Sequence, residues 1–123
     1  MYQAVYVALG GAIGALLRHF VQLFFVNRIG ISFMGTLFVN ATGSLVLGFL
    51  IGIMSNHVSW PVELRIFLAI GLLGSYTTFS TLSLEIVESL QRGEVLAAGA
   101  NLVLSVVLGL LAASMGLFVG RLL

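Results

Sequence analysis

The chain has 123 residues, of which 60% are hydrophobic and only 7% are charged, and its mean hydropathy is +1.20. These values lie far outside the range of a water-soluble domain and predict an integral membrane protein. Cysteine is absent, which excludes disulfides and thiolate metal sites, and the net charge of +1 without a basic cluster argues against a nucleic-acid partner.

Four apolar segments are each long enough to cross a bilayer, which requires about 20 helical residues. Only short connections separate them, so neighbouring helices should run antiparallel. The predicted fold is all-α, with a single four-helix transmembrane domain over residues 1–123 and a multi-pass location in the membrane. The expected segments are Gln3–Val26, Ile31–Met54, Leu64–Leu90 and Val95–Leu122.

The third segment contains a hydroxyl-rich run from Gly71 to Glu85. Its seven hydroxyl side chains need partners at bilayer depth, because hydrocarbon offers none. Gly71 and Gly74, followed by β-branched residues at 77 and 78, weaken the helix and free backbone carbonyls, which membranes tolerate only beside a cavity or an ion. We therefore predict a broken helix at a permeation site, with a glycine kink healed by neighbouring hydroxyls as the alternative.

The carbonyls of Gly74 and Thr77 would lose their helical donors at such a break. A cation can satisfy them. In an inverted dimer the two breaks would meet near the bilayer midplane and offer four carbonyl oxygens, enough for a small hard ion such as sodium. Sodium at these carbonyls is therefore the expected metal site.

Polar residues recur every four positions in the last three segments and should each form one helical face. Asn40 is the most informative, because its amide offers two donors to an anion, although a hydrogen bond between helices would explain it equally well. Glu85 is the one carboxylate that could be embedded. The three series are Thr36, Asn40 and Ser44; Thr77, Thr81 and Glu85; and Asn101, Ser105 and Gly109.

Two further residues are candidates for an anion pathway. Arg18 lies about two-thirds of the way along the first segment, where it could attract anions to a vestibule or extend to lipid headgroups. Phe79 lies inside the hydroxyl-rich run, and the positive edge of its ring could stabilise a small anion weakly. Weak binding suits conduction, because the ion must also leave.

The arginines give no preferred orientation. Arg28 and Arg92 lie on one side of the predicted membrane domain, and Arg65 and Arg121 lie on the other. Orientation follows the imbalance of positive residues between the two sides, and here the tally is equal. The chain should insert both ways, and oppositely oriented copies would form an antiparallel dimer with a midplane site.

Three motifs resemble the small bacterial fluoride channels called Fluc or CrcB, and the similarity covers essentially the whole chain. They are Gly10–Arg18, Gly35–Gly43 and Gly71–Thr81, of which the last two are the more specific. The resemblance implies an antiparallel, dual-topology dimer in the inner (plasma) membrane, with two fluoride pathways and a central sodium ion at the helix breaks. It also implies passive export of fluoride and hence fluoride resistance.

The resemblance implies roles for the candidate residues. It places Asn40 and Phe79 at the pore, Arg18 near a vestibule, and a polar track at Thr36, Ser105 and Glu85.

Two positions depart from the family pattern. Leu82 replaces the second phenylalanine of Thr-Phe-Ser-Thr-Phe, and Asn101 stands where a tyrosine is expected. Either the pore tolerates both changes or a different homologue supplies the missing aromatics in a heterodimer. The balanced arginines favour the homodimer.

Other functions are less well supported. A small multidrug-resistance type, proton-coupled exporter would need an embedded carboxylate in its first helix, and none is present. A scaffold subunit would not need so many buried hydroxyls. No phosphate-binding loop or catalytic constellation is found, so enzymatic chemistry is not expected.

Overall fold

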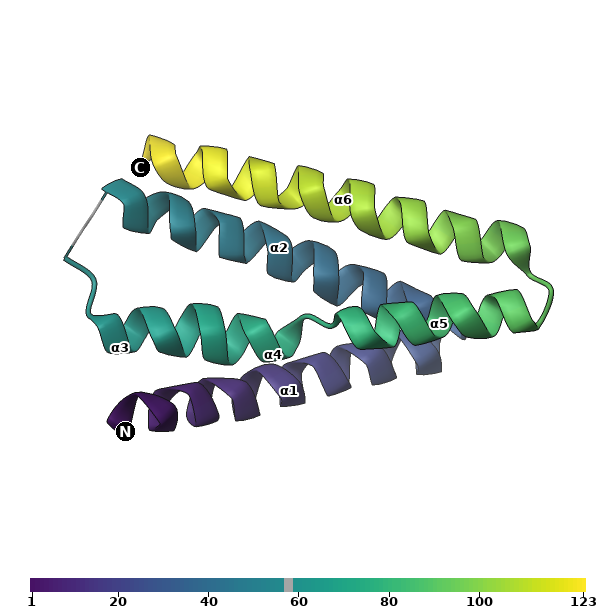
Figure 1. The fold of residues 1–123 in the computed structure, drawn as a ribbon, viewed down its shortest axis with the longest axis horizontal. Helices are drawn as coiled ribbons and strands as arrows, with labels where there is room; N and C mark the ends of the chain where they lie inside the picture. Colours follow the sequence, from purple (N-terminus) through teal and green to yellow (C-terminus); the bar gives the residue numbers. More distant parts are fainter. Residues whose placement is uncertain (57–58) are drawn as a thin grey trace.

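The computed structural model describes residues 1–56 and 59–123 and is entirely helical within them. The chain crosses back and forth four times, and both termini lie at the same end of the molecule (Figure 1). Four spans are long and apolar enough to cross a membrane. The third consists of several pieces. The elements are α1 (Tyr2–Ile29), α2 (Ser32–Asn56), α3 (Val62–Arg65), the π-helix η1 (Ile66–Leu73), α4 (Gly74–Tyr76), α5 (Phe79–Gln91) and α6 (Val95–Leu122).

The predicted spans are confirmed to within three residues at each end, and the fourth span agrees exactly as Val95–Leu122. Local chemistry explains the ends. Gly30 terminates α1 in the left-handed conformation, with φ of 73°, and its N–H bonds to the Phe25 and Val26 carbonyls. Pro61 precedes α3 as its N-cap, a position where a missing N–H is harmless.

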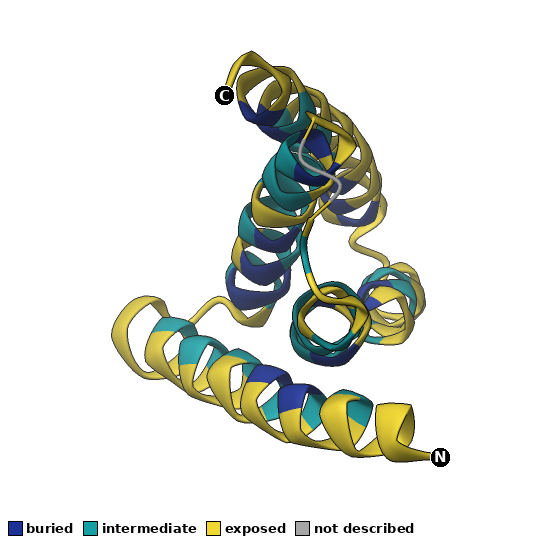
Figure 2. Cartoon of the chain, turned by 90° about the vertical axis from the view of Figure 1, so that its left-hand side faces the viewer, coloured by how far each residue is buried: buried dark blue, intermediate teal, exposed yellow. Residues whose placement is uncertain are grey.

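Small residues let the helices pair closely. A side chain at Gly116 would collide with the Leu45 carbonyl oxygen on α2, and one at Gly71 would lie 3.0 Å from the Cα of Gly10 on α1. Backbone contact of this kind is how helices associate in lipid, where no hydrophobic force drives them together. The result is two close pairs, α2 with α6 and α1 with the first half of the third span (Figure 2).

The third span is broken, as predicted, but the break lies after the glycines. Gly71 belongs to the π-helix and Gly74 is helical, with φ of −62° and ψ of −32°. The chain becomes extended at Thr77, with ψ of 157°, and at Thr78, with φ of −151° and ψ of 122°. Of the two features expected to weaken the helix, the β-branched pair Thr77 and Thr78 marks the break, whereas Gly71 permits contact with α1.

Most described residues of the chain are exposed or half-buried (Figure 2). Within residues 1–56 and 59–123, the buried apolar side chains are Val39, Met54, Leu73, Leu82 and Ala98. The buried polar side chains are Thr36, Thr78, Asn101 and Ser105. Polar burial is therefore concentrated on α2, the break and α6, where the candidate site lies.

Candidate functional site

Asn40 of α2 pairs with the backbone of the break. Its Nδ2 donates to the Thr78 carbonyl at 2.9 Å, and its Oδ1 accepts from the Thr78 N–H at 2.8 Å. In a continuous helix, that N–H would donate to the carbonyl of Gly74. The break is thus satisfied from another helix, as polar backbone groups in a membrane must be.

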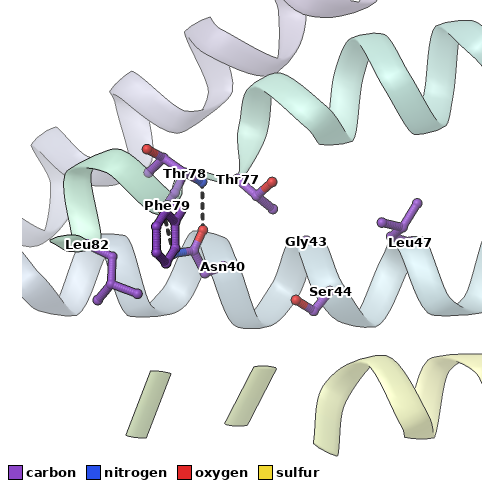
Figure 3. A pocket seen from close by; sticks show the side chains of 8 residues that line it. All are labelled: Asn40, Gly43, Ser44, Leu47, Thr77, Thr78, Phe79 and Leu82. Atoms are coloured by element: carbon purple, nitrogen blue, oxygen red, sulfur yellow. Dashed lines mark hydrogen bonds between the residues drawn. The ribbon is translucent and has the colours of Figure 1, made fainter. Parts of the chain in front are cut away.

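A cavity of about 250 Å³ opens beside this pair (Figure 3). Its lining combines one side-chain amide and several hydroxyl groups with apolar side chains. Phe79, the first residue of α5, is 81% exposed in the single copy, whereas Leu82 is buried. The lining residues are Asn40, Gly43, Ser44, Leu47, Thr77, Thr78, Phe79 and Leu82.

Thr81 belongs to the cap that restarts the helix after the break. The Thr78 hydroxyl accepts from the Thr81 N–H at 3.3 Å, which satisfies one free donor at the start of α5. The same hydroxyl donates to Thr81 Oγ1 at 3.1 Å. Because the chain is extended between them, Thr77 does not continue the helical face of Thr81 and Glu85, and that expectation was wrong.

A second group of polar residues links three helices. Thr36 Oγ1 donates to Glu85 Oε1 at 2.6 Å and accepts from Gln22 Nε2 at 3.5 Å. Thr36 is fully buried. Sequence reasoning missed Gln22, although its place four residues after Arg18 puts both polar side chains on one face of α1.

Glu85 also borders a larger cavity at the end of the molecule that carries the first and third connections. This cavity measures about 370 Å³ and includes Glu88, Arg92 and Asn101 in its lining. Glu85 Oε2 is buried and has no hydrogen-bond partner among the described residues. A buried carboxylate oxygen without a partner keeps its full acceptor capacity, so a small donor that entered the site could bind to it.

The polar residues of α6 lie together, as their spacing predicts. Ser105 Oγ donates to Asn101 Oδ1 at 3.1 Å, and both side chains are at least 92% buried. Asn101 lines the same cavity as Glu85, and Glu85 bonds to Thr36, so one member of each series on α2, α5 and α6 lies in this region.

Arg18 turns inward to the break. Its Nη1 donates to the Thr77 carbonyl at 3.5 Å, and the residue is half-buried. A positive group beside free carbonyls at the end of a helix is electrostatically favourable. The guanidinium group therefore lies against the third span, and a role in attracting anions stays a prediction.

The equal distribution of arginines is reproduced by the fold. Arg28 and Arg92 lie at one end of the molecule with the first and third connections, and Arg65 and Arg121 lie at the other (Figure 1). Arg92 and Glu94 form an exposed ion pair at 3.3 Å. Exposed pairs contribute little stability, so the four outer arginines are best regarded as topology signals.

Comparison with known proteins identifies the family. The family model described as CrcB-like protein, Camphor Resistance (CrcB), matches residues 5–117. A protein of Hyphomonas neptunium named fluoride-specific ion channel FluC is 47% identical over 117 residues, covering 94% of this chain and 92% of the relative. Fluoride-specific ion channel FluC 1 of Nitrobacter hamburgensis is 44% identical over 118 residues, covering 95% and 94%.

A third relative, fluoride-specific ion channel FluC of Rhizobium meliloti, is 42% identical over 122 residues, or 98% of each chain. Identity at this level over nearly the full length, together with four membrane spans and the break, leaves no ambiguity of fold. The chain belongs to the CrcB family of membrane proteins.

Proposed function

We propose that this protein is a fluoride-specific ion channel of the inner membrane, which exports fluoride passively and so confers fluoride resistance. The observation that carries the proposal is that hydrogen-bond donors and an aromatic ring lie together beside the break in the third span. The relatives of this chain are named fluoride-specific ion channels. Fluoride is a small, strongly hydrated anion, so a pathway must replace its water with hydrogen-bond donors.

Each candidate residue has a distinct part in the pathway. Asn40 uses one Nδ2 hydrogen on Thr78 and keeps the other for an anion. Phe79 presents a ring edge. Thr36, Glu85 and Ser105 extend the polar track, and Arg18 raises the local positive potential near the break.

Glu85 needs a specific explanation, since a negative charge would repel an anion. Its Oε1 accepts from Thr36, so in this geometry the carboxyl group orients the threonine hydroxyl. Its Oε2 is free of hydrogen bonds to described residues and can bind a donor such as water within the larger cavity. Glu85 therefore acts as an acceptor that organises donors along the track.

The working unit of the proposal is an antiparallel homodimer. One copy leaves Gly74 exposed beside the break, where hydrocarbon would offer its backbone carbonyl no partner, and it leaves Phe79 81% exposed at the cavity. The equal arginine tally permits both orientations. A heterodimer with a homologue would be favoured instead if Leu82 prevented a homodimer from conducting.

A sodium ion at the dimer interface is part of the same proposal. The Thr78 N–H is engaged by Asn40 and so is not available to the Gly74 carbonyl, and Gly74 is exposed in the single copy. Thr77 accepts a long hydrogen bond from Arg18, which leaves a second lone pair. Neutral carbonyl oxygens are the ligands that a hard monovalent cation takes, and they would hold it without trapping fluoride.

The test is fluoride efflux from proteoliposomes that contain the purified protein. We expect valinomycin-initiated efflux of fluoride with no efflux of chloride or ethidium. Asn40→Asp should abolish it, because the substitution replaces the donors with a charge that repels the anion. Ethidium efflux without fluoride efflux would replace the proposal with a multidrug exporter, for which the described part of α1 offers no carboxylate.

A further inference from the structure

Asn40 does more than line a cavity, because its amide is bonded twice to a single residue on a different segment. Both backbone polar groups of Thr78, which a helix would pair with other turns, are bonded to Asn40: the N–H at 2.8 Å and the carbonyl at 2.9 Å (Figure 3). Both distances are ideal for N–H···O bonds. A chance contact would not satisfy donor and acceptor at once.

The conformation of Thr78 explains why the fit is so good. With φ of −151° and ψ of 122°, Thr78 is extended, and an extended residue directs its own N–H and carbonyl to the same side. A side-chain amide also carries a donor and an acceptor side by side. Asn40 therefore pairs with Thr78 as a neighbouring β-strand would, although α2 is a helix.

We propose that Asn40 is the positioning residue that holds the third span open at Thr77 and Thr78. The glycines of the run do not provide the break, since Gly74 is helical and Gly71 lies in the π-helix. Neither threonine has a positive φ, and the Thr78 hydroxyl caps the helix that follows, so the cap explains how α5 restarts and Asn40 explains how the backbone between the helices is held. The break is set from α2, and without Asn40 the Thr78 N–H would return to the Gly74 carbonyl or lose its partner.

The surrounding contacts make the pair specific. Gly43, one turn further along α2, lies against Thr77 and Tyr76 so closely that a side chain there would collide with the Thr77 methyl group. This close approach brings the Asn40 amide within reach of the backbone. Aspartate lacks the donor for the Thr78 carbonyl, and glutamine is one methylene too long for the same register.

The consequence for conduction rests on the proposed function. By holding Thr78 extended, Asn40 fixes the start of α5 and hence the position of Phe79, and it denies the Gly74 carbonyl its helical donor. The one N–H that remains on Nδ2 is the part available to an anion. One side chain thus sets the backbone and supplies a ligand.

Backbone chemical shifts test the inference without reference to flux. The chain contains five threonines, at positions 36, 42, 77, 78 and 81, so protein labelled with ¹³C,¹⁵N-threonine gives a spectrum of five backbone sites. In the assembled protein, Thr77 and Thr78 should have Cα shifts of extended backbone. In Asn40→Ala, both should move towards helical or averaged values while Thr36 and Thr42 on α2 stay unchanged, which separates a local change from general unfolding.

A matched control removes an equivalent bond elsewhere. Asn56, also on α2, donates through Nδ2 to the Arg121 carbonyl at 2.6 Å, so Asn56→Ala deletes an amide-to-backbone bond far from the break. It should leave Thr77 and Thr78 extended. Extended shifts at both threonines in folded Asn40→Ala protein would overturn the inference.

A second variant covers the case in which Asn40→Ala does not assemble. An ester in place of the amide at position 78 removes the N–H and retains every side chain, Asn40 included. Because the ester oxygen itself changes the shift of residue 78, Thr77 and Thr81 are the reporters here: we expect their shifts to change and the exchange of nearby amides to rise about tenfold. Unchanged shifts in the ester would overturn the inference, whereas a lack of fluoride flux in unmodified protein with these shifts intact would reject the proposed function alone.

Discussion

Thr36 and Glu85 are joined by a 2.6 Å hydrogen bond between residues 49 positions apart, which ties the start of α2 to the middle of α5. Thr36 is fully buried, and the carboxyl group has no hydrogen bond at its second oxygen among the described residues. A bond this short and buried is sensitive to the loss of either partner, because the remaining group keeps its desolvation penalty.

The first prediction follows from this pair. Thr36→Val keeps the shape of the side chain but leaves Glu85 Oε1 without its donor, so fluoride efflux should fall about tenfold or more and stability by about 1–3 kcal/mol. Glu85→Gln keeps an acceptor for Thr36 and should retain efflux within about tenfold. Both are measured in proteoliposomes after the dimer fraction is isolated.

Thr42→Val is the control, since Thr42 lies on the same helix and its hydroxyl bonds outside the polar track, to the Phe38 carbonyl at 2.7 Å and to Tyr76 Oη at 3.0 Å. It should conduct normally. Equal loss in both threonine variants would indicate general destabilisation of α2 instead of a polar track.

The second prediction concerns the aromatic edge. Phe79→Ile removes the ring at comparable apolar bulk, so fluoride flux should fall by roughly two- to tenfold, the factor that corresponds to the loss of an edge contribution of about 0.5–1.5 kcal/mol. Phe118→Ile, at a 65% exposed position on α6, should have no effect on flux. Undiminished flux in Phe79→Ile would mean that the pathway lies elsewhere and that Phe79 packs against a partner.

The third prediction tests the close pair of α2 and α6. Gly116→Ala places a Cβ against the Leu45 carbonyl, a backbone atom that cannot move alone, so the yield of folded protein should drop sharply. Gly99→Ala, on the same helix, has nothing within 4 Å and should be neutral or slightly stabilising. Size-exclusion chromatography in detergent compares the two, and equal yields would show that α2 and α6 can separate without loss of fold.

Much of this architecture could be read from the sequence, because four apolar segments with short connections leave few alternatives. The place of the break could not. The glycines suggested a break near Gly71 and Gly74, but Gly71 instead allows α1 to approach closely. The break falls at Thr77 and Thr78, where the Asn40 side chain reaches the backbone. Side-chain-to-backbone pairing between distant segments has no local sequence signal.

The candidate site was predicted in composition and only partly in arrangement. Spacing placed Thr36 and Asn40 on one face, and both do contact the third span. Spacing also placed Thr77 on the face of Glu85, which fails because helical periodicity ends at an extended residue. Gln22 was missed, since a single glutamine in an apolar segment signals a contact without naming its partner.

The fourth prediction is dual topology. Ser59→Cys and Gln91→Cys place single thiols at exposed positions on opposite ends of the molecule in a chain with no native cysteine. Gln91 is preferred to Gly93, whose φ of 76° favours glycine. Each variant should react with a membrane-impermeant maleimide on both sides of the membrane, because the arginines do not choose an orientation.

Labelling of each thiol from one side alone would contradict the antiparallel homodimer. A heterodimer of fixed orientation would then be the better assembly. The double variant Arg65→Gln/Arg121→Gln removes the positive charges from one end of the molecule. It should convert two-sided labelling to one-sided labelling, because the remaining Arg28 and Arg92, at the other end, would set a single orientation.

The fifth prediction is that sodium supports conduction. In the proposed antiparallel dimer the carbonyls of Gly74 and Thr77 would be doubled in number, and a buried cation held by them would lower the electrostatic cost of fluoride in the membrane. Exhaustive exchange of sodium for N-methylglucamine during purification should remove most of the fluoride flux, and added sodium should restore it. Arg18 tests the same point, because its guanidinium already bonds to the Thr77 carbonyl at 3.5 Å and would compete with a cation. Arg18→Gln should therefore lower the sodium concentration needed for half-maximal flux, and full flux without sodium in the parent protein would contradict the site.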